Sequence, residues 1–273
     1  MITFPNAKIN LGLNIVSRRP DGYHNIETVF YPIPLTDSLE IVPAEGSEST
    51  LTCYGRVVDC PTEKNLVMKA YRMMEKEFGL PPVDIYLVKH IPDGAGLGGG
   101  SSDASFCMKM LNDMFELGCT DEQLAKMASK IGADCPFFIH NKPMMATGIG
   151  DEFTPTDVCL KGKHMLLVKP DVSVPTKAAY AQVTPAPSAK PIPEILSDGI
   201  ENWQKDLVND FEKSVFAQYP SLAEIKRTLL ESGASYAAMS GSGSSIFGIF
   251  SCAEMAEKAA DNFKEYSHFV IQL

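Results

Sequence analysis

Residues 94 to 104 read GAGLGGGSSDA, and five of the first seven are glycine. An alternating apolar stretch from Val83 to Ile91 precedes them, and apolar residues at helical spacing follow from Phe106 to Phe115, so we predict a strand, a glycine loop and a helix in that order. Glycines let successive backbone N–H groups converge on an oxyanion, and the start of a helix adds unpaired N–H donors. The segment therefore predicts a phosphate-binding loop, with a plain surface turn as the alternative.

Three of these glycines, Gly94, Gly96 and Gly99, also match the dinucleotide-binding pattern G-x-G-x-x-G. That site needs an acidic residue about 20 positions later at the end of the next strand, whereas Glu116 falls inside the predicted helix. Two serines follow the glycines where a Walker A loop would have Lys and then Ser or Thr, and no protein-kinase signature occurs. A dinucleotide-dependent oxidoreductase and the commoner kinase loops are therefore disfavoured.

The rest of the chain mixes predicted strands and helices. The first strand, residues 7–15, places Lys8 and Asn10 on one face, about 7 Å apart. Further strands are expected over residues 24–33, 39–42, 51–54, 164–169, 236–239, 246–250 and 268–273, and helices over 66–78, 120–132 and 221–231. The predicted helix boundaries are Gly79 as a C-terminal glycine and the capping pairs Thr120/Gln123, Ser221/Glu224 and Ser251/Glu254. We predict an α+β protein of two halves, residues 1–155 and 156–273, that share a cleft.

The composition fits a folded globular protein, with 273 residues, 45% of them apolar, and a formal charge of −10. This charge argues against attraction to nucleic acid or anionic membrane through the overall field. The seven cysteines are scattered without zinc-site spacing, so we expect neither disulfides nor structural zinc. Because the sequence contains no signal-peptide pattern and no apolar run of about 18 residues, we expect a cytoplasmic protein, a monomer or weak homodimer, without a nucleic-acid or membrane partner.

Several segments together resemble a known enzyme family. IPDGAGLGGGSSDA (91–104) resembles the second motif of the galactokinase, homoserine kinase, mevalonate kinase and phosphomevalonate kinase (GHMP) superfamily. PNAKINLGLNIVSRRPDGYHNIETVF (5–30), EKNL (63–66), GADCPFFI (132–139), NDFE (209–212) and MSGSGSSIF (239–247) narrow the resemblance to the 4-diphosphocytidyl-2-C-methyl-D-erythritol kinases. The segments occur in order over nearly the whole chain. The resemblance implies a two-domain GHMP-kinase-like fold with a cleft between the halves.

The resemblance also implies a reaction and a set of site residues. Such a kinase uses ATP and Mg²⁺ to phosphorylate the 2-hydroxyl of a cytidine-diphosphate-linked methylerythritol, in the non-mevalonate route to isoprenoid precursors. Lys8 and Asp134 match the catalytic pair. The matching ATP-binding positions are Asn65, Pro92, Asp93, Gly94, Ala95, Gly96, Leu97, Gly98, Gly99, Gly100, Ser101 and Ser102. The matching substrate positions are Asn10, Tyr23, His24, Thr176, Tyr180, Gly241 and Ser242, with Tyr23 and Tyr180 expected to sandwich the cytosine and His24 to pair with its edge. No residue is assigned to the metal.

The residues alone leave simpler interpretations open. Asp134 precedes Cys135 and Pro136 and would, without the resemblance, be interpreted as a helix cap. Lys8 on the polar face of a strand would by itself be interpreted as a solvent-facing lysine. Near Asp134 it could instead hold that carboxylate ionised and orient the acceptor hydroxyl, or offset charge on the phosphoryl group. Cys135 is interpreted as a buried filler rather than a reactive thiol.

Other positions are equally open. His24 could be an ordinary strand histidine, and residues 240–245 a plain connection between strands. Two departures from the family pattern are Tyr180, where relatives often have Phe, and Asp103, where some have Asn. A catalytically silent nucleotide-binding protein on the same fold is the rival from another functional class.

Overall fold

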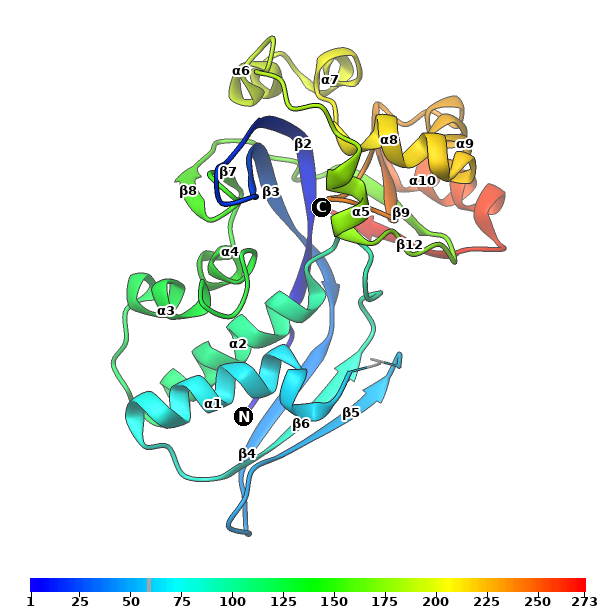
Figure 1. Cartoon of the computed structure of the whole chain (residues 1–273). Helices are drawn as coiled ribbons and strands as arrows, with labels where there is room; N and C mark the ends of the chain where they lie inside the picture. Colours follow the sequence, from blue (N-terminus) through cyan, green and yellow to red (C-terminus); the bar gives the residue numbers. More distant parts are fainter. Residues whose placement is uncertain (58–59) are drawn as a thin grey trace. The chain divides into compact units, whose positions relative to one another are not determined.

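The computed structural model describes residues 1–57 and 60–273. The described chain forms two compact units (Figure 1). The first contains Met1–Ala7, Leu35–Asp93 and Gly98–Lys142, and the second Lys8–Pro34, Gly94–Leu97 and Pro143–Leu273. Neither unit is one continuous stretch, because the chain passes from one to the other several times. The division into residues 1–155 and 156–273 stays a prediction about family domains.

The first unit is a sheet covered by helices. The strand order is β1 (Ile2–Thr3), β4 (Ser38–Pro43), β6 (Val83–Lys89) and β5 (Thr50–Gly55), with β5 and β6 parallel and the other pairs antiparallel. Helices α1 (Leu66–Phe78) and α2 (Gly99–Met114) lie side by side over one face of this sheet (Figure 1). The unit also contains a 3-10 turn, η1 (Thr62–Lys64), and helices α3 (Asp121–Ala128) and α4 (Cys135–His140). Apolar side chains of α1, α2, β4 and β6 form its core.

The second unit contains two four-stranded sheets. The first has the order β2 (Asn6–Arg18), β3 (His24–Thr36), β7 (Met144–Thr147) and β8 (Glu152–Pro155), and the second β10 (Tyr236–Met239), β11 (Ile246–Phe250), β9 (His164–Lys169) and β12 (Ser267–Gln272). The helical elements are α5 (Thr176–Ala181), α6 (Ile192–Ser197), α7 (Ile200–Asp206), α8 (Phe211–Gln218), α9 (Pro220–Glu231), α10 (Ala253–Ala260) and the 3-10 turn η2 (Asp261–Phe263). Its core joins the second sheet to α8, α9 and α10.

Most of the predicted elements are present. Helix α1 has the predicted bounds, because the side chain of Asn65 accepts a hydrogen bond from the Val67 N–H at its start and Gly79 adopts a left-handed conformation at its end. The capping box of Thr120 and Gln123 is confirmed, although α3 ends at Ala128, short of the predicted 132. The mixed helix and sheet content confirms the predicted α+β class.

Two predicted capping pairs are wrong. Helix α9 begins at Pro220, whose ring presets the helical φ and whose missing N–H needs no partner, so Ser221 already lies inside the helix. Helix α10 follows Cys252 and has no side-chain cap, while the Ser251 hydroxyl contacts the sulfur of Met255. The short elements β1, β7, β8 and α4 were not predicted.

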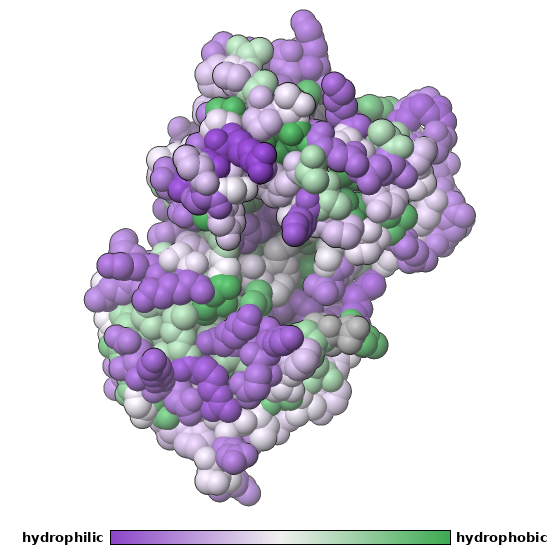
Figure 2. Space-filling view, in the orientation of Figure 1, coloured by the Kyte–Doolittle hydropathy of each residue, from purple (hydrophilic) through white to green (hydrophobic). Residues whose placement is uncertain are grey.

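The molecular surface visible in Figure 2 is mostly hydrophilic. Within residues 1–57 and 60–273, no helix is both long enough and apolar enough to cross a membrane.

Candidate active site

The glycine loop has the predicted strand–loop–helix arrangement. Strand β6 ends at Lys89 and α2 begins at Gly99, after Gly94, Gly96 and Gly98 have each adopted a positive φ. Gly98 is the N-terminal cap of α2, and its carbonyl accepts the hydrogen bond of the Ser102 N–H. The N–H groups of the first helical turn therefore have no partner within the helix and can bind an anion.

The beginning of α2 also carries a buried hydroxyl. The Oγ atom of Ser102 has no hydrogen-bond partner among the residues that the structure describes. The nearby Ser105 hydroxyl, by contrast, donates hydrogen bonds to the carbonyls of Ser101 and Cys135, at 2.8 and 2.7 Å. An unpartnered buried donor at a helix N-terminus fits a phosphate ligand.

Asp134 is joined to this same turn of α2 by its neighbours. The bond from Ser105 to the Cys135 carbonyl attaches the start of α4 to α2, and a Cβ atom on Gly132 would lie 3.7 Å from the Ser101 hydroxyl. Asp134 occupies the N-terminal cap position of α4, yet its side chain makes no capping hydrogen bond. This geometry disfavours the interpretation of Asp134 as a simple helix cap.

Cys135 is a structural residue. Its side chain is fully buried, and burial raises the pKa of the thiol to about 11. The thiol is therefore protonated at neutral pH, which confirms the interpretation as a buried filler.

Lys8 lies in the second unit and is only 3% exposed. Its Nζ donates hydrogen bonds to Asn10 Oδ1 at 2.8 Å and to the Gly96 carbonyl at 3.0 Å, and it lies 4.8 Å from the centre of the Phe30 ring. Asn10 in turn donates to the Thr28 hydroxyl at 3.0 Å. The predicted pairing of Lys8 and Asn10 on one face of the strand is confirmed, and that face is buried rather than exposed to solvent.

The first half of the glycine loop packs against the loop of residues 240–245, also within the second unit. The Ser240 hydroxyl donates to the Gly96 carbonyl at 2.8 Å, and the Ser245 N–H donates to the Ala95 carbonyl at 3.2 Å. A Cβ atom on Gly96 would lie 2.0 Å from the Ser240 carbonyl oxygen, so no other residue fits there. Residues 240–245 are thus a support for the glycine loop and more than a connection between strands.

Side chains from distant parts of the second unit meet around α5. The His24 ring stacks on the Tyr180 ring, with the centroids 5.0 Å apart and the planes 19° from parallel, and Tyr180 packs edge-on against Phe211. The Thr176 and Ser242 hydroxyls are 3.1 Å apart. Tyr23 is 62% exposed, and the ring that contacts Tyr180 is that of His24. The structure thus brings together His24 with Tyr180 and Thr176 with Ser242.

Two polar clusters escaped the sequence analysis. In the first unit, Lys89 forms ion pairs with Asp37 and Asp103 behind the glycine loop. In the second unit, Asn209 donates hydrogen bonds to the carbonyls of Met239 and Gly241, both at 2.8 Å. The alternation of β6 could have predicted that Lys89 is buried, because Lys89 follows Val83, Ile85 and Leu87 on the buried face of the strand.

Comparisons with known proteins place this chain in a family. Residues 65–142 match the GHMP kinases N terminal domain, and residues 192–268 match the GHMP kinases C terminal domain. The 4-diphosphocytidyl-2-C-methyl-D-erythritol kinases of Bacteroides fragilis and Parabacteroides distasonis are 56% and 54% identical to the chain. The alignments cover 94% of this chain and 95% of the first relative, and 98% of this chain and 96% of the second.

Solved structures of related kinases support the same family assignment. A crystal structure of 4-(cytidine 5'-diphospho)-2C-methyl-D-erythritol kinase is 31% identical, with a TM-score of 0.85 over 99% of this chain and 98% of that one. The Methanococcus jannaschii mevalonate kinase, at 15% identity, has a TM-score of 0.74 over 100% of this chain and 98% of that one, and shares the fold. The chain therefore belongs to the 4-diphosphocytidyl-2-C-methyl-D-erythritol kinase family of the GHMP kinases.

Proposed function

We propose that the chain transfers the terminal phosphoryl group of ATP to the 2-hydroxyl of 4-diphosphocytidyl-2-C-methyl-D-erythritol, giving the 2-phosphate and ADP in the non-mevalonate route to isoprenoid precursors. The observation that carries this proposal is the first turn of α2. It combines a glycine loop, unpaired N–H groups and the buried Ser102 hydroxyl with the adjoining Asp134, whose side chain makes no capping hydrogen bond to α4. The printed activity of the relatives supports the choice of substrate.

In phosphoryl transfer the protein mainly aligns the two substrates and neutralises the negative charge of the transferred group. Phosphoryl transfer passes through a loose transition state, with negative charge on the transferred group. The loop of residues 92–102 binds the ATP phosphates through its N–H groups, and Mg²⁺ arrives on the phosphates as part of the co-substrate. Asp134 accepts the proton of the 2-hydroxyl while the oxygen of that hydroxyl bonds to the terminal phosphorus and the bond from this phosphorus to ADP breaks.

Lys8 supplies a fixed positive charge in this proposal. Its bonds to Asn10 and Gly96 hold the ammonium in one position, and a preorganised charge stabilises a transition state without reorganisation. Asn10 thereby links the substrate site to the loop that binds ATP. Asn65, whose side chain caps α1, fixes the helix that precedes β6.

The acceptor is recognised at two ends. The rings of Tyr23 and Tyr180 stack on the cytosine, and His24, which follows Tyr23 in the chain, has its ring against that of Tyr180. Stacking accepts any base, so hydrogen bonds from His24 to the edge of the ring supply the selectivity. In this proposal the hydroxyls of Thr176 and Ser242, which are 3.1 Å apart, and the N–H group of Gly241 bind the acceptor's diphosphate.

A coupled assay of ADP release tests the proposal. The protein is supplied with ATP, Mg²⁺ and one of three acceptors: the cytidine-diphosphate methylerythritol, mevalonate or homoserine. We expect turnover with the cytidine compound alone, and turnover only with another acceptor would contradict the substrate assignment. An Asp134→Asn variant is expected to bind ATP and to lose turnover by orders of magnitude; absence of turnover in the unchanged protein would favour the silent nucleotide-binding protein.

The location and the assembly state complete the proposal. We propose that the enzyme works in the cytoplasm as a monomer or weak homodimer. Sedimentation of the purified protein over a range of concentrations tests the assembly state, and a stable higher oligomer would contradict it.

A further inference from the structure

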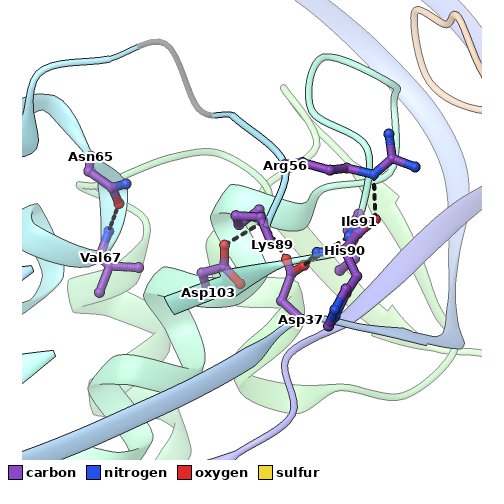
Figure 3. A network of polar contacts seen from close by, with 8 residues as sticks. All are labelled: Asp37, Arg56, Asn65, Val67, Lys89, His90, Ile91 and Asp103. Atoms are coloured by element: carbon purple, nitrogen blue, oxygen red, sulfur yellow. Dashed lines mark hydrogen bonds and ion pairs between the residues drawn. The ribbon is translucent and has the colours of Figure 1, made fainter. Parts of the chain in front are cut away.

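Three ionisable side chains are buried together in the first unit. Asp37, Lys89 and Asp103 are 0%, 4% and 1% exposed. The Lys89 ammonium forms an ion pair with Oδ2 of Asp37 and, at 2.6 Å, another with Oδ2 of Asp103 (Figure 3). The reaction proposed above uses none of these groups.

The Asp37 carboxylate is held by donors on both oxygens. Its Oδ1 accepts hydrogen bonds from the backbone N–H groups of His90 and Ile91, at 2.6 and 2.8 Å, and its Oδ2 faces Lys89 (Figure 3). Both oxygens of Asp37 are therefore matched by hydrogen-bond donors. Asp37 balances the charge of Lys89. Through its hydrogen bonds it also fixes the backbone where β6 leads into the glycine loop.

The carboxyl group of Asp103 has fewer hydrogen-bond partners than that of Asp37. Its Oδ1 is buried and has no hydrogen-bond partner in the part of the chain that the structure describes. If both carboxylates were ionised, the three side chains would carry one uncompensated negative charge in the interior, which is strongly unfavourable. A proton on Asp103 removes this charge.

A further cation, Arg56, lies near the cluster: its Nε donates to the His90 carbonyl at 3.0 Å, and its side chain is exposed, so water screens its charge (Figure 3). The thiols near Asp103 supply no positive charge. Cys107 lies one turn further along α2, and Cys53 lies on β5. Burial raises the pKa of both thiols, so they are neutral at neutral pH. Burial also raises the pKa of Asp103 to about 8, and the nearby Asp37 adds to the shift, against the opposing effect of Lys89.

The cluster of Asp37, Lys89 and Asp103 lies next to both ends of the glycine loop. Lys89 is the last residue of β6, Asp37 binds the next two residues, and Asp103 is in the second turn of α2. A Cβ atom on Gly99 would lie 3.3 Å from the Lys89 Nζ. The three side chains thus join the entry of the loop to its exit.

We propose that Asp37, Lys89 and Asp103 position the phosphate-binding loop and that Asp103 is held there as a neutral acid, whose ionisation in alkaline solution loosens the loop. This inference rests on the proposed function in one respect, the identity of ATP as the nucleotide. The protonation of Asp103 is a property of the folded chain and can be measured without any ligand.

The sign of the pH dependence follows from the direction of the shift. The pKa of Asp103 in the folded protein lies above the value of about 3.9 expected in the unfolded chain, so the folded state binds the proton more tightly. The stability that this proton contributes is complete below about pH 4 and is lost as the pH rises through about 8.

The test compares Asp103→Asn, a mimic of the neutral acid, with the matched control Asp113→Asn on the exposed face of the same helix. The ¹³C carboxyl signal that disappears in Asp103→Asn is followed by NMR from about pH 6 to about pH 9. Urea unfolding and the dissociation constant of a non-hydrolysable ATP analogue with Mg²⁺ are measured over the same range.

We expect the assigned carboxyl signal to titrate near pH 8. In the unchanged protein and in Asp113→Asn, the affinity for the ATP analogue falls several-fold as the pH rises through this value. Asp103→Asn keeps the neutral-pH affinity and shows no such fall.

An Asp103 signal that is already ionised at neutral pH would overturn the proposal, as would an affinity of Asp103→Asn that falls like that of the control. If the signal titrates as expected while no protein binds the ATP analogue, the proposed function fails and the neutral acid remains.

Discussion

Two of the molecule's glycine-rich loops lie at the start of α2 and at residues 240–245. Buried side chains hold each loop in place, and these side chains are charged at the first loop and uncharged at the second. In the first unit the support is ionic, because Lys89 is paired with Asp37 and Asp103. In the second unit it is uncharged, because Asn209 donates to the carbonyls of Met239 and Gly241 and its own oxygen accepts from the Phe211 N–H. The ionic support binds a proton and the amide support does not, so only the first makes the stability and the loop sensitive to pH.

Removing the cation from the ionic support should have the largest effect on stability. Lys89→Met leaves the Asp37 carboxylate buried without its partner, and we expect a loss of about 3–5 kcal/mol in the free energy of unfolding. Urea unfolding at several pH values measures it, with Lys76→Met on the exposed face of α1 as the control. A loss no greater than that of the control would show that the ion pairs contribute nothing.

A side chain at Gly96 should break the contact between residues 94–97 of the glycine loop and residues 240–245, which both lie in the second unit. In Gly96→Ala the new Cβ meets the Ser240 carbonyl oxygen at 2.0 Å, at a residue with a φ of +75°, so we expect about 2–3 kcal/mol of strain and a large loss of turnover. The matched control is Gly46→Ala, where no atom would lie within 4 Å of a Cβ. Equal effects of the two changes on turnover would contradict this packing.

The uncharged support should give a smaller effect without pH dependence. Asn209→Ala removes two hydrogen bonds from buried carbonyls, which costs about 1–3 kcal/mol. Because these groups do not titrate, the loss should be the same at every pH, and KM for the acceptor should rise more than KM for ATP. Steady-state kinetics and urea unfolding measure both effects, and Asn202→Ala on the surface of α7 is the control. A loss of stability that changes with pH would remove the contrast between the supports.

The contrast also shows what the sequence could predict. Helix α1 and strands β9, β10 and β11 have their predicted bounds, because periodicity, a helix cap and a left-handed glycine are local signals. The glycine loop was found for the same reason, and the family motifs identified the reaction.

The supports behind the loops depend on contacts between distant residues. Asp37 and Lys89 are 52 positions apart, and Asn209 is 32 positions from Gly241. Periodicity cannot show such pairings. The stacking of His24 on Tyr180 is likewise a contact that the sequence did not predict, and the sandwich of Tyr23 and Tyr180 around the cytosine stays a prediction. The NDFE segment, which contains Asn209, was recognised as a family motif, but only the structure shows which carbonyls it binds.

Analysis of the reaction product by ³¹P NMR tests the central claim most directly. After incubation of the protein with ATP, Mg²⁺ and the cytidine-diphosphate methylerythritol, we expect one new phosphomonoester signal, assigned to the 2-position, while the diphosphate signals of the acceptor stay unchanged. ADP formed without this signal, or a phosphomonoester at another hydroxyl, would contradict the account.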